Sequence, residues 1–299
     1  MNTTPRLRAG NERALVLGGG GSAGNAWLIG VVAGLHEGGL DLTEADLVVG
    51  TSAGATAAAQ ITGASPTDLL AAILSAPTPQ PPAGPRGLSP ITSTHLERTN
   101  AIIAASADLA DMRRRVGADA IELAAASGAA GRERWRETVA ARLPSPRWPE
   151  STVLLTAVDA DTGEPVELDR DSGVDLVDAV AASCAGGPAY TIGGRRYIDG
   201  GYRRSSENAD LAARCEGVLV LSPLGGRTRH PARWHSDLAA QVEELRGGGS
   251  TVETVLPDAD SLEAFGDSMM NPSTRPFAAR AGHRQGLRLA EEIAEFWGR

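Results

Sequence analysis

The sequence has no lysine and few aromatic residues, so its basic side chains other than histidine are all arginines. Aromatic residues make up 4% of the 299 residues, which leaves alanine, valine, leucine and isoleucine to fill a core. Hydrophobic residues make up 42%, enough for a sizeable core. The formal net charge of -9 disfavours nucleic acid as a partner, because an acidic chain repels its phosphates.

Cysteine is also scarce, and Cys184 and Cys215 are too few for a disulfide framework in a chain of this length. Neither a C-x-x-C nor an H-E-x-x-H spacing occurs, so we predict no metal site and no bound cofactor. No run of about 18 apolar residues predicts a transmembrane helix. The polar residues 1–11 do not resemble a signal peptide, so we expect a cytoplasmic protein.

The order of the predicted elements indicates an α/β fold. Residues 13–17 and 46–50 are short apolar runs, the first followed by glycines and the second ending in Gly50, which suits buried parallel strands. Helical apolar spacing over residues 25–36 separates them, and a helix of small residues follows from Ala55 to Ile61. This βαβ beginning predicts a three-layer fold in which a mainly parallel sheet lies between helices.

We expect one domain over residues 12–299. Residues 76–150 form a proline-bordered helical insertion, which begins with a loop at 76–90 and is a candidate lid. Further strands are predicted at 153–158, 166–168, 195–198 and 217–221. A capped helix is expected from Ser172 to Ala182. The C-terminal part, 226–299, is predicted to hold surface helices at 233–246, 258–270 and 277–297.

The pentapeptide Gly50-Thr51-Ser52-Ala53-Gly54 has the G-x-S-x-G pattern between a predicted strand and a predicted helix. A serine in such a sharp turn needs small neighbours, because the turn brings strand and helix together. The two glycines meet that need, and the serine hydroxyl is then exposed at the carboxyl end of the sheet. The following helix N-terminus directs amide groups toward the same place. Ser52 is therefore a candidate nucleophile.

A glycine run after the first predicted strand indicates an anion-binding loop. Gly18 to Gly21 is followed by Ser22, Ala23 and Gly24. Glycine leaves backbone N–H groups uncovered and free to adopt unusual dihedrals. Such a loop suits a phosphate or the oxyanion of a tetrahedral acyl intermediate. Because loops after neighbouring parallel strands share one sheet edge, we expect these amides to face Ser52.

Asp199-Gly200-Gly201 follows another short predicted strand. An isolated Asp-Gly pair usually marks a turn, and for Asp199 considered alone that interpretation stays open. A free aspartate has a pKa of about 3.9 and is a weak base toward a serine hydroxyl. Burial would raise that pKa and improve the match.

Together, these three motifs resemble those of the patatin-like phospholipase family, which includes bacterial patatin-like acyl hydrolases. The first runs from Gly19 to Gly24, the second surrounds Ser52, and the third begins at Asp199. The stretch from Ala182 to Pro188 also looks like the family's Ala-Ser-x-Ala-x-Pro segment. The resemblance covers roughly residues 13–225.

The resemblance implies a lipid acyl hydrolase of the phospholipase A type, which acts on lipid or ester substrates in solution or at a membrane surface. Ser52 would attack the ester carbonyl, and Asp199 would accept its proton in a Ser-Asp dyad. The backbone amides of Gly19, Gly20 and Gly21 would form the oxyanion hole. The other motif glycines are Gly24, Gly50, Gly54, Gly200 and Gly201.

One position departs from the family pattern. The family often has arginine or lysine just before the last glycine of the first motif, where this sequence has Ala23. A cation there would hold the loop or a lipid phosphate. Its absence leaves the oxyanion amides in place but weakens the prediction of a phospholipid headgroup.

The nearest alternative is an α/β-hydrolase-type esterase with a Ser-Asp-His triad. Ser52, Asp199 and His283 follow the chain order of that fold. None of the five histidines lies in a glycine-rich or strand-end context, and Ser52 comes after only two strands, which is early for that fold. The sequence therefore favours the dyad.

Two further alternatives belong to other classes. Gly19-x-Gly21-x-x-Gly24 matches a dinucleotide-binding pattern, but the second strand ends without the acidic residue that would bind the ribose. A non-catalytic lipid-binding protein can share the fold, because fold alone does not establish activity. The presence of both Ser52 and Asp199 argues against that reading. The sequence carries no prediction of oligomeric state.

Overall fold

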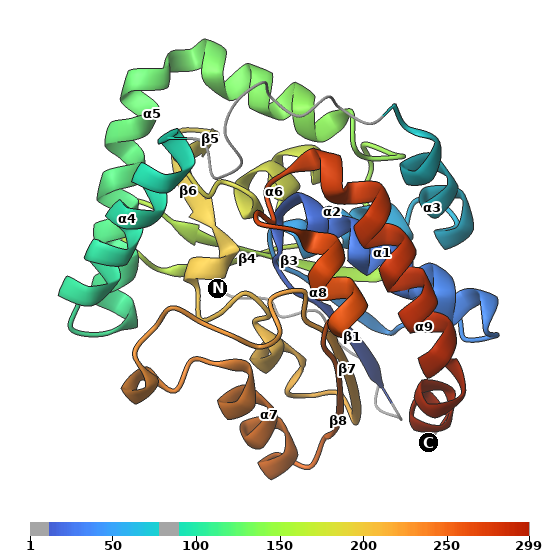
Figure 1. Cartoon of the computed structure of the whole chain (residues 1–299). Helices are drawn as coiled ribbons and strands as arrows, with labels where there is room; N and C mark the ends of the chain where they lie inside the picture. The colour runs from blue at the N-terminus through green and yellow to red at the C-terminus, as the bar shows by residue number, and fades with distance from the viewer. Residues whose placement is uncertain (1–11, 78–89, 299) are drawn as a thin grey trace.

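The computed structural model describes residues 12–77 and 90–298, which form an eight-stranded sheet with helices on both faces (Figure 1). The strand order is β5-β6-β3-β2-β1-β7-β8, and β4 pairs with β3 off this path. The strands are β1 Arg13–Leu17, β2 Leu47–Gly50, β3 Thr152–Asp159, β4 Pro165–Leu168, β5 Tyr190–Ile192, β6 Arg195–Asp199, β7 Gly217–Leu221 and β8 Thr251–Val255. From β3 to β8 along this order the neighbours are parallel, whereas β4 and β6 run antiparallel to β3. The predicted three-layer, mainly parallel fold is confirmed.

Alternate residues of the central strands enter different cores, because successive side chains of a strand point to opposite faces. Leu15 and Leu17 of β1 pack with α1, α2, α6 and α9, whereas Ala14 and Val16 pack with α7 and a short 3₁₀ turn at 209–212. The helices are α1 Gly21–Glu37, α2 Ala53–Ile61, α3 Pro66–Ser75, α4 Pro90–Ala105, α5 Leu109–Ala140, α6 Leu176–Ser183, α7 Leu238–Gly247, α8 Ala259–Phe265 and α9 Arg275–Trp297. None of these described helices is long and apolar enough to cross a membrane.

The helical insertion packs against the antiparallel end of the sheet. Met112 and Val116 of α5 contact a third core, which includes Val158 of β3 and Ile198 of β6. Figure 1 shows α5 curving around the edge formed by β5 and β6. The helix α5 is interrupted by a kink at Gly128, where φ is 66°. Most of the predicted loop at 76–90 lies outside the described residues, and a mobile lid stays a prediction.

Several predicted boundaries are wrong for local reasons. The helix expected from Ser172 begins at Leu176, because the Ser172 hydroxyl donates to the carbonyl of Asp169 within the preceding turn. The helix expected from residue 233 begins only at Leu238, where Asp237 accepts from the Ala240 N–H as an N-cap. The short elements α3, β5 and β8 were not predicted.

The last helix, α9, leaves one face exposed, as predicted, and packs its other face closely against α1. Glycines of α1 and α9 face one another across the interface, which brings the two backbones into contact. A Cβ placed on Gly30 would lie 2.2 Å from the Ala279 carbonyl oxygen, and one on Gly282 would lie 2.5 Å from that of Trp27. At these glycines no side chain makes the contact, so the close approach of the two backbones cannot be read from the sequence.

Candidate active site

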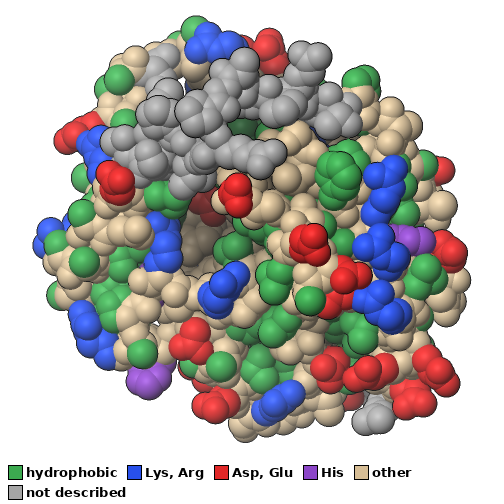
Figure 2. All heavy atoms as spheres, in the orientation of Figure 1, with side chains coloured by type: hydrophobic (Ala, Val, Ile, Leu, Met, Phe, Trp, Pro, Cys, Tyr) green, Lys and Arg blue, Asp and Glu red, His purple; other side chains and the backbone are tan. Residues whose placement is uncertain are grey.

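Ser52 occupies a tight turn between β2 and α2. Its backbone has φ 53° and ψ −113°, a conformation that residues with a side chain rarely adopt. The turn requires Gly54, because a Cβ at that position would lie 1.8 Å from the carbonyl oxygen of Leu17 in β1. The close approach of α2 to β1 places the partly exposed Ser52 at the carboxyl edge of the parallel strands. Figure 2 shows this face of the molecule hollowed close to the end of β6.

Asp199 is the last residue of β6 and lies directly against Ser52. Its Oδ2 accepts a hydrogen bond from Ser52 Oγ at 2.7 Å, and its Oδ1 accepts from the Gly201 N–H at 2.8 Å. Gly200 permits this placement, because a Cβ there would lie 2.1 Å from the Thr156 hydroxyl of β3. The serine and the carboxylate are therefore joined at one sheet edge, although they come from distant parts of the chain.

The environment makes Asp199 a stronger base than a free aspartate. Burial raises the pKa of Asp199 to about 6, and this outweighs the opposing effect of the hydrogen bonds from Gly201 and Ser52. At neutral pH the group remains mainly ionised. Its pKa lies close to the range in which proton acceptance from a hydroxyl is efficient.

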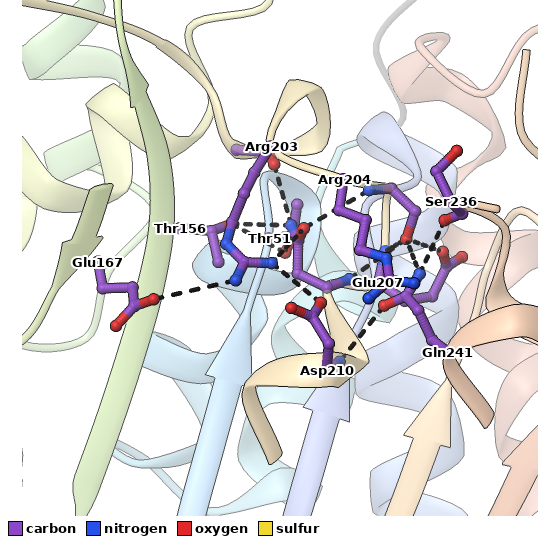
Figure 3. Close-up of polar contacts among 12 residues, drawn as sticks. Thr51, Thr156, Glu167, Arg203, Arg204, Glu207, Asp210, Ser236 and Gln241 are labelled. Atoms are coloured by element: carbon purple, nitrogen blue, oxygen red, sulfur yellow. Dashed lines mark hydrogen bonds and ion pairs between the residues drawn. The ribbon is translucent and has the colours of Figure 1, made fainter. Parts of the chain in front are cut away.

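A buried amide links the two loops that carry Ser52 and Asp199. Asn208 Nδ2 donates to the Thr51 hydroxyl at 3.0 Å and to the Gly200 carbonyl at 2.9 Å. The hydroxyls of Thr51 and Thr156 lie 2.9 Å apart, and Figure 3 shows these two residues side by side at the strand ends. Asn208 itself has φ 52°, a left-handed conformation that asparagine tolerates better than most residues.

Ion pairs of Arg203 and Arg204 stabilise the segment between Asp199 and β7, which carries Asn208. Figure 3 shows Arg203 between Glu167 and Asp210, with distances of 3.9 Å and 2.9 Å to the two carboxylates. Arg204 forms a bidentate ion pair with Glu244, in which both hydrogen bonds are 2.7 Å long. These ion pairs hold the chain between Asp199 and β7 on either side of Asn208.

Glu207 is fully buried and is held by three serine hydroxyls. The hydroxyls of Ser205, Ser206 and Ser222 each donate to its carboxylate at 2.7 Å. This arrangement fixes the segment that carries the Ser206 carbonyl. That carbonyl in turn accepts the Gly19 N–H at 2.7 Å. One segment therefore holds all three loops: Ser206 binds the glycine loop, and Asn208 binds the loops of Ser52 and Asp199.

The glycine loop lies against Ser52, but not all of its amides are free. A Cβ on Gly19 would lie 3.6 Å from the Cβ of Ser52. Because the Gly19 N–H already donates to Ser206, it is not available to an oxyanion, and the predicted role of that amide is corrected here. Within the described residues, the amides of Gly20 and Gly21 have no acceptor.

Two residues at the end of α6 hold the backbone of Ser52. The Ser52 N–H donates to Ser183 Oγ at 3.0 Å, and Cys184 Sγ donates to the Ser52 carbonyl at 3.0 Å. Burial, assisted by the charge of Asp199, raises the pKa of Cys184 to about 12, so its thiol stays neutral. The sequence marked the stretch 182–188 but did not predict these roles.

A cation reaches the glycine loop from a distant helix. Arg275, the first residue of α9, donates through Nη1 to the Ser22 carbonyl and to Asn25 Oδ1, both at 3.0 Å. Burial, together with the nearby Arg142, lowers the pKa of Arg275. The Ala23 position lacks a basic side chain, but its backbone N–H donates to the Met269 carbonyl at 2.9 Å. The glycine loop is therefore held by Met269, which precedes α9, and by Arg275, the first residue of α9.

The Ser-Asp-His triad is not assembled. His283 Nε2 lies 2.8 Å from the carboxylate of Glu37, at the far end of α1. Within the described part of the chain, Asp199 accepts hydrogen bonds only from Ser52 and Gly201. Among the described residues, no three or more His, Cys, Asp or Glu side chains come together in a cluster suited to a metal ion.

The family model for patatin-like phospholipase matches residues 15–213, well over half of the chain. The chain belongs to the patatin-like phospholipase family. This membership confirms the resemblance seen in the motifs, and it supports the hydrolysis of lipid esters. No curated protein matches this patatin-like chain significantly.

Solved structures similar to this patatin-like chain include VipD and ExoU. VipD from Legionella pneumophila is 14% identical, with a TM-score of 0.42 over 95% of this chain and 67% of that one. The type III effector protein ExoU is 16% identical, with a TM-score of 0.40 over 95% of this chain. This chain spans only 53% of the ExoU chain.

Proposed function

We propose that this patatin-like protein hydrolyses carboxylic esters of lipids or phospholipids, as a lipid acyl hydrolase of the phospholipase A type, through a Ser52–Asp199 dyad. The observation that carries the proposal is the 2.7 Å hydrogen bond from Ser52 Oγ to Asp199 Oδ2. The substrate is presented in solution or at a membrane surface, and a cytoplasmic location stays a prediction.

In the first half-reaction, Ser52 Oγ attacks the ester carbonyl carbon while Asp199 Oδ2 takes the hydroxyl proton. The carbonyl oxygen becomes an oxyanion, which accepts hydrogen bonds from the amides of Gly20 and Gly21. When the tetrahedral intermediate collapses, Asp199 gives the proton to the departing alcohol oxygen. The acyl group is left as an ester on Ser52.

In the second half-reaction, Asp199 accepts a proton from a water molecule as that water attacks the acyl-serine carbonyl. The same glycine amides stabilise the second oxyanion. The acid is released when the proton returns to Ser52 Oγ. A carboxylate serves both steps without a histidine because burial has raised its pKa to about 6.

The test is ester hydrolysis by the protein and by Ser52→Ala and Asp199→Asn, on a panel of p-nitrophenyl esters and phospholipids. Both changes should lower kcat by about a thousandfold or more, because each removes a group that acts in bond making. A fluorophosphonate probe should label the native protein and fail to label Ser52→Ala. Labelling of Ser52→Ala at the native rate would show that another residue is the nucleophile.

Matched controls separate these effects from general damage. Ser172→Ala and Asp171→Asn change the same residue types in an exposed turn after β4. Both should keep kcat within about twofold, as exposed substitutions usually do. Full activity in Asp199→Asn would contradict the dyad, even if Ser52→Ala were inactive.

The triad alternative makes a different prediction for His283. His283 is bonded to Glu37 and not to Asp199, so His283→Ala should keep most of the esterase activity. A fall in kcat comparable to that of Ser52→Ala would restore the triad. Detectable binding of a nicotinamide or flavin cofactor would instead favour the dinucleotide alternative, and absence of fluorophosphonate labelling would favour a non-catalytic lipid-binding protein.

A further inference from the structure

The large hydrophobic side chains that are exposed gather in one stretch of the chain. Among the side chains that the structure describes, they all come from residues 256–287, and they are Leu256, Leu262, Met270, Phe277 and Leu287. Met270, Phe277 and Leu262 are 62%, 59% and 49% exposed. Single exposed hydrophobic residues are normal, whereas several gathered together indicate a surface that contacts a partner or a membrane. This region, from Leu256 to Leu287, is called the α8–α9 surface below.

The two helices that carry the α8–α9 surface lie side by side. Arg284 of α9 is 3.7 Å from Asp260 of α8, and the Ser261 hydroxyl donates to Gln285 at 3.0 Å. Figure 1 shows α8 and α9 in front of the sheet, and Figure 2, in the same orientation, shows hydrophobic and charged side chains mixed over them. The hollow near the end of β6 opens on the same face. One extended partner on this side of the molecule therefore meets both.

The α8–α9 surface also contacts the glycine loop. The Met269 carbonyl accepts a backbone N–H of that loop at 2.9 Å. A Cβ on Gly21 would lie 2.6 Å from Met270 Sδ, so the exposed Met270 side chain lies against a glycine whose amide is proposed to bind the oxyanion. Phe277 follows by two residues Arg275, which donates to a carbonyl of the loop at 3.0 Å. A partner bound to this surface is therefore brought to the edge of the site.

The charges of the α8–α9 surface do not select one sign. The exposed charged residues of α8, Asp260 and Glu263, are acidic, whereas the exposed charged residues of α9 between Phe277 and Leu287 are arginines. A zwitterionic headgroup carries both a phosphate and an ammonium group, so each of its charges finds a partner here. An anionic bilayer would instead be repelled by the net charge of -9 over the chain.

We propose that the α8–α9 surface docks on a zwitterionic phospholipid bilayer, with Leu262, Met270 and Phe277 inserted among the headgroups. Docking brings the glycine loop and Ser52 to the ester. The proposal rests on the proposed function, because it takes the bilayer to be the place where the substrate lies. Burial of the apolar side chains supplies the attraction, since interfacial binding grows with the apolar area buried.

The test measures co-sedimentation with phosphatidylcholine vesicles, in a Ser52→Ala background so that the vesicles are not hydrolysed. Leu262→Gln combined with Phe277→Gln should lower the partition coefficient by about tenfold or more, because the amides bury less apolar area. The matched control, Leu262→Ile combined with Phe277→Trp, keeps that area and should bind at least as tightly. Binding of the glutamine pair at the level of the unchanged surface would overturn the proposal.

A kinetic measurement keeps the test independent of how well the variant folds. With Ser52 restored, the glutamine pair should keep kcat/KM for dissolved p-nitrophenyl acetate within about twofold. It should lose about tenfold or more in hydrolysis of the phosphatidylcholine vesicles. An equal loss on both substrates would overturn the docking role of this surface.

The remaining outcomes separate the partner from the chemistry. Binding only to vesicles that contain phosphatidylserine would overturn the zwitterionic partner. A concentration-dependent dimer that the glutamine pair abolishes, without vesicle binding, would show that the surface joins two copies of the chain. Native protein that binds the vesicles but hydrolyses neither ester would overturn the proposed function and leave the docking surface intact.

Discussion

The side-chain amide of Asn208 lies 2.9 Å from the carbonyl oxygen of Gly200, the residue that follows Asp199. The same amide nitrogen lies 3.0 Å from the hydroxyl of Thr51, the residue that precedes Ser52. One buried side chain therefore fixes the relative position of the two loops that bear the proposed dyad. Because a displacement of about 1 Å at reacting groups lowers rates by up to about a hundredfold, Asn208 is expected to act as a positioning residue.

Asn208→Gly removes this amide without straining the left-handed backbone, because glycine adopts that conformation freely. We expect kcat to fall about tenfold with little change in KM, and the free energy of unfolding to fall by about 1–3 kcal/mol. Steady-state kinetics and urea denaturation measure the two effects. The rate of fluorophosphonate labelling should fall with kcat. A destabilised variant with native labelling would show that Asn208 is only structural.

Hydrolysis should depend on the ionisation of Asp199. Because burial raises the pKa of Asp199 to about 6, the carboxylate is protonated below that pH and cannot accept the Ser52 proton. We therefore expect kcat/KM for p-nitrophenyl acetate to fall as the pH decreases through about 6 and to reach a plateau above about 7. A pH-stat assay at constant ionic strength measures the profile. An inflection near 4, the value of an exposed aspartate, would contradict the burial of this group.

Arg275 is expected to hold the glycine loop in place of a basic residue at Ala23. Arg275→Gln removes the cation that contacts the Ser22 carbonyl and Asn25, so the amides of Gly20 and Gly21 lose part of their positioning. We expect kcat to fall about tenfold or more, which is below the loss of about 100- to 1,000-fold seen when an oxyanion donor is removed outright. Arg275→Lys should recover part of the rate.

The matched control for this change is Arg280→Gln, an exposed arginine of the same helix. It should leave both kcat and KM within about twofold of the native values. If Arg275→Gln instead raised KM for phospholipids alone and left kcat unchanged, the guanidinium would be binding a lipid phosphate. That outcome would contradict the positioning role.

The chemistry of the site was predictable because short segments carry it. The turn around Ser52 needs small residues near the nucleophile, and Gly50 and Gly54 lie two positions before and after it in the sequence. Likewise, the run from Gly18 to Gly21 directly predicts backbone N–H groups that no side chain covers. Asp199 was identified only through its combination with these two motifs, since an Asp-Gly pair alone usually marks a turn.

The support of the site was not predictable, because it depends on contacts between distant segments. Nothing near Gly19 in the sequence indicates that Ser206 occupies its amide, which excludes it from the oxyanion hole. Arg275 reaches Ser22 across 253 positions of the chain. The close approach of α9 to α1 at their glycines is equally hidden, because no side chain makes that part of the contact.

The α1–α9 interface makes a last prediction, which concerns stability. Gly30 lies in the middle of α1, where alanine would ordinarily favour the helix by about 1 kcal/mol. A methyl group at this position would lie 2.2 Å from the Ala279 carbonyl oxygen and 2.9 Å from the backbone nitrogen of His283. Because both atoms belong to the backbone of α9, the helices must separate to accept it.

We therefore expect Gly30→Ala to lower the free energy of unfolding by about 1–3 kcal/mol, as measured by urea denaturation. The matched control is Gly247→Ala at the end of α7, where an added methyl would contact nothing within 4 Å. That change should be neutral or stabilising by up to about 1 kcal/mol, because it brings only the helix preference of alanine. If Gly30→Ala proved as stable as Gly247→Ala, α9 would not be packed on α1 at backbone contact. The position of Arg275 at the glycine loop would then lose its structural basis, because α9 is the element that carries it there.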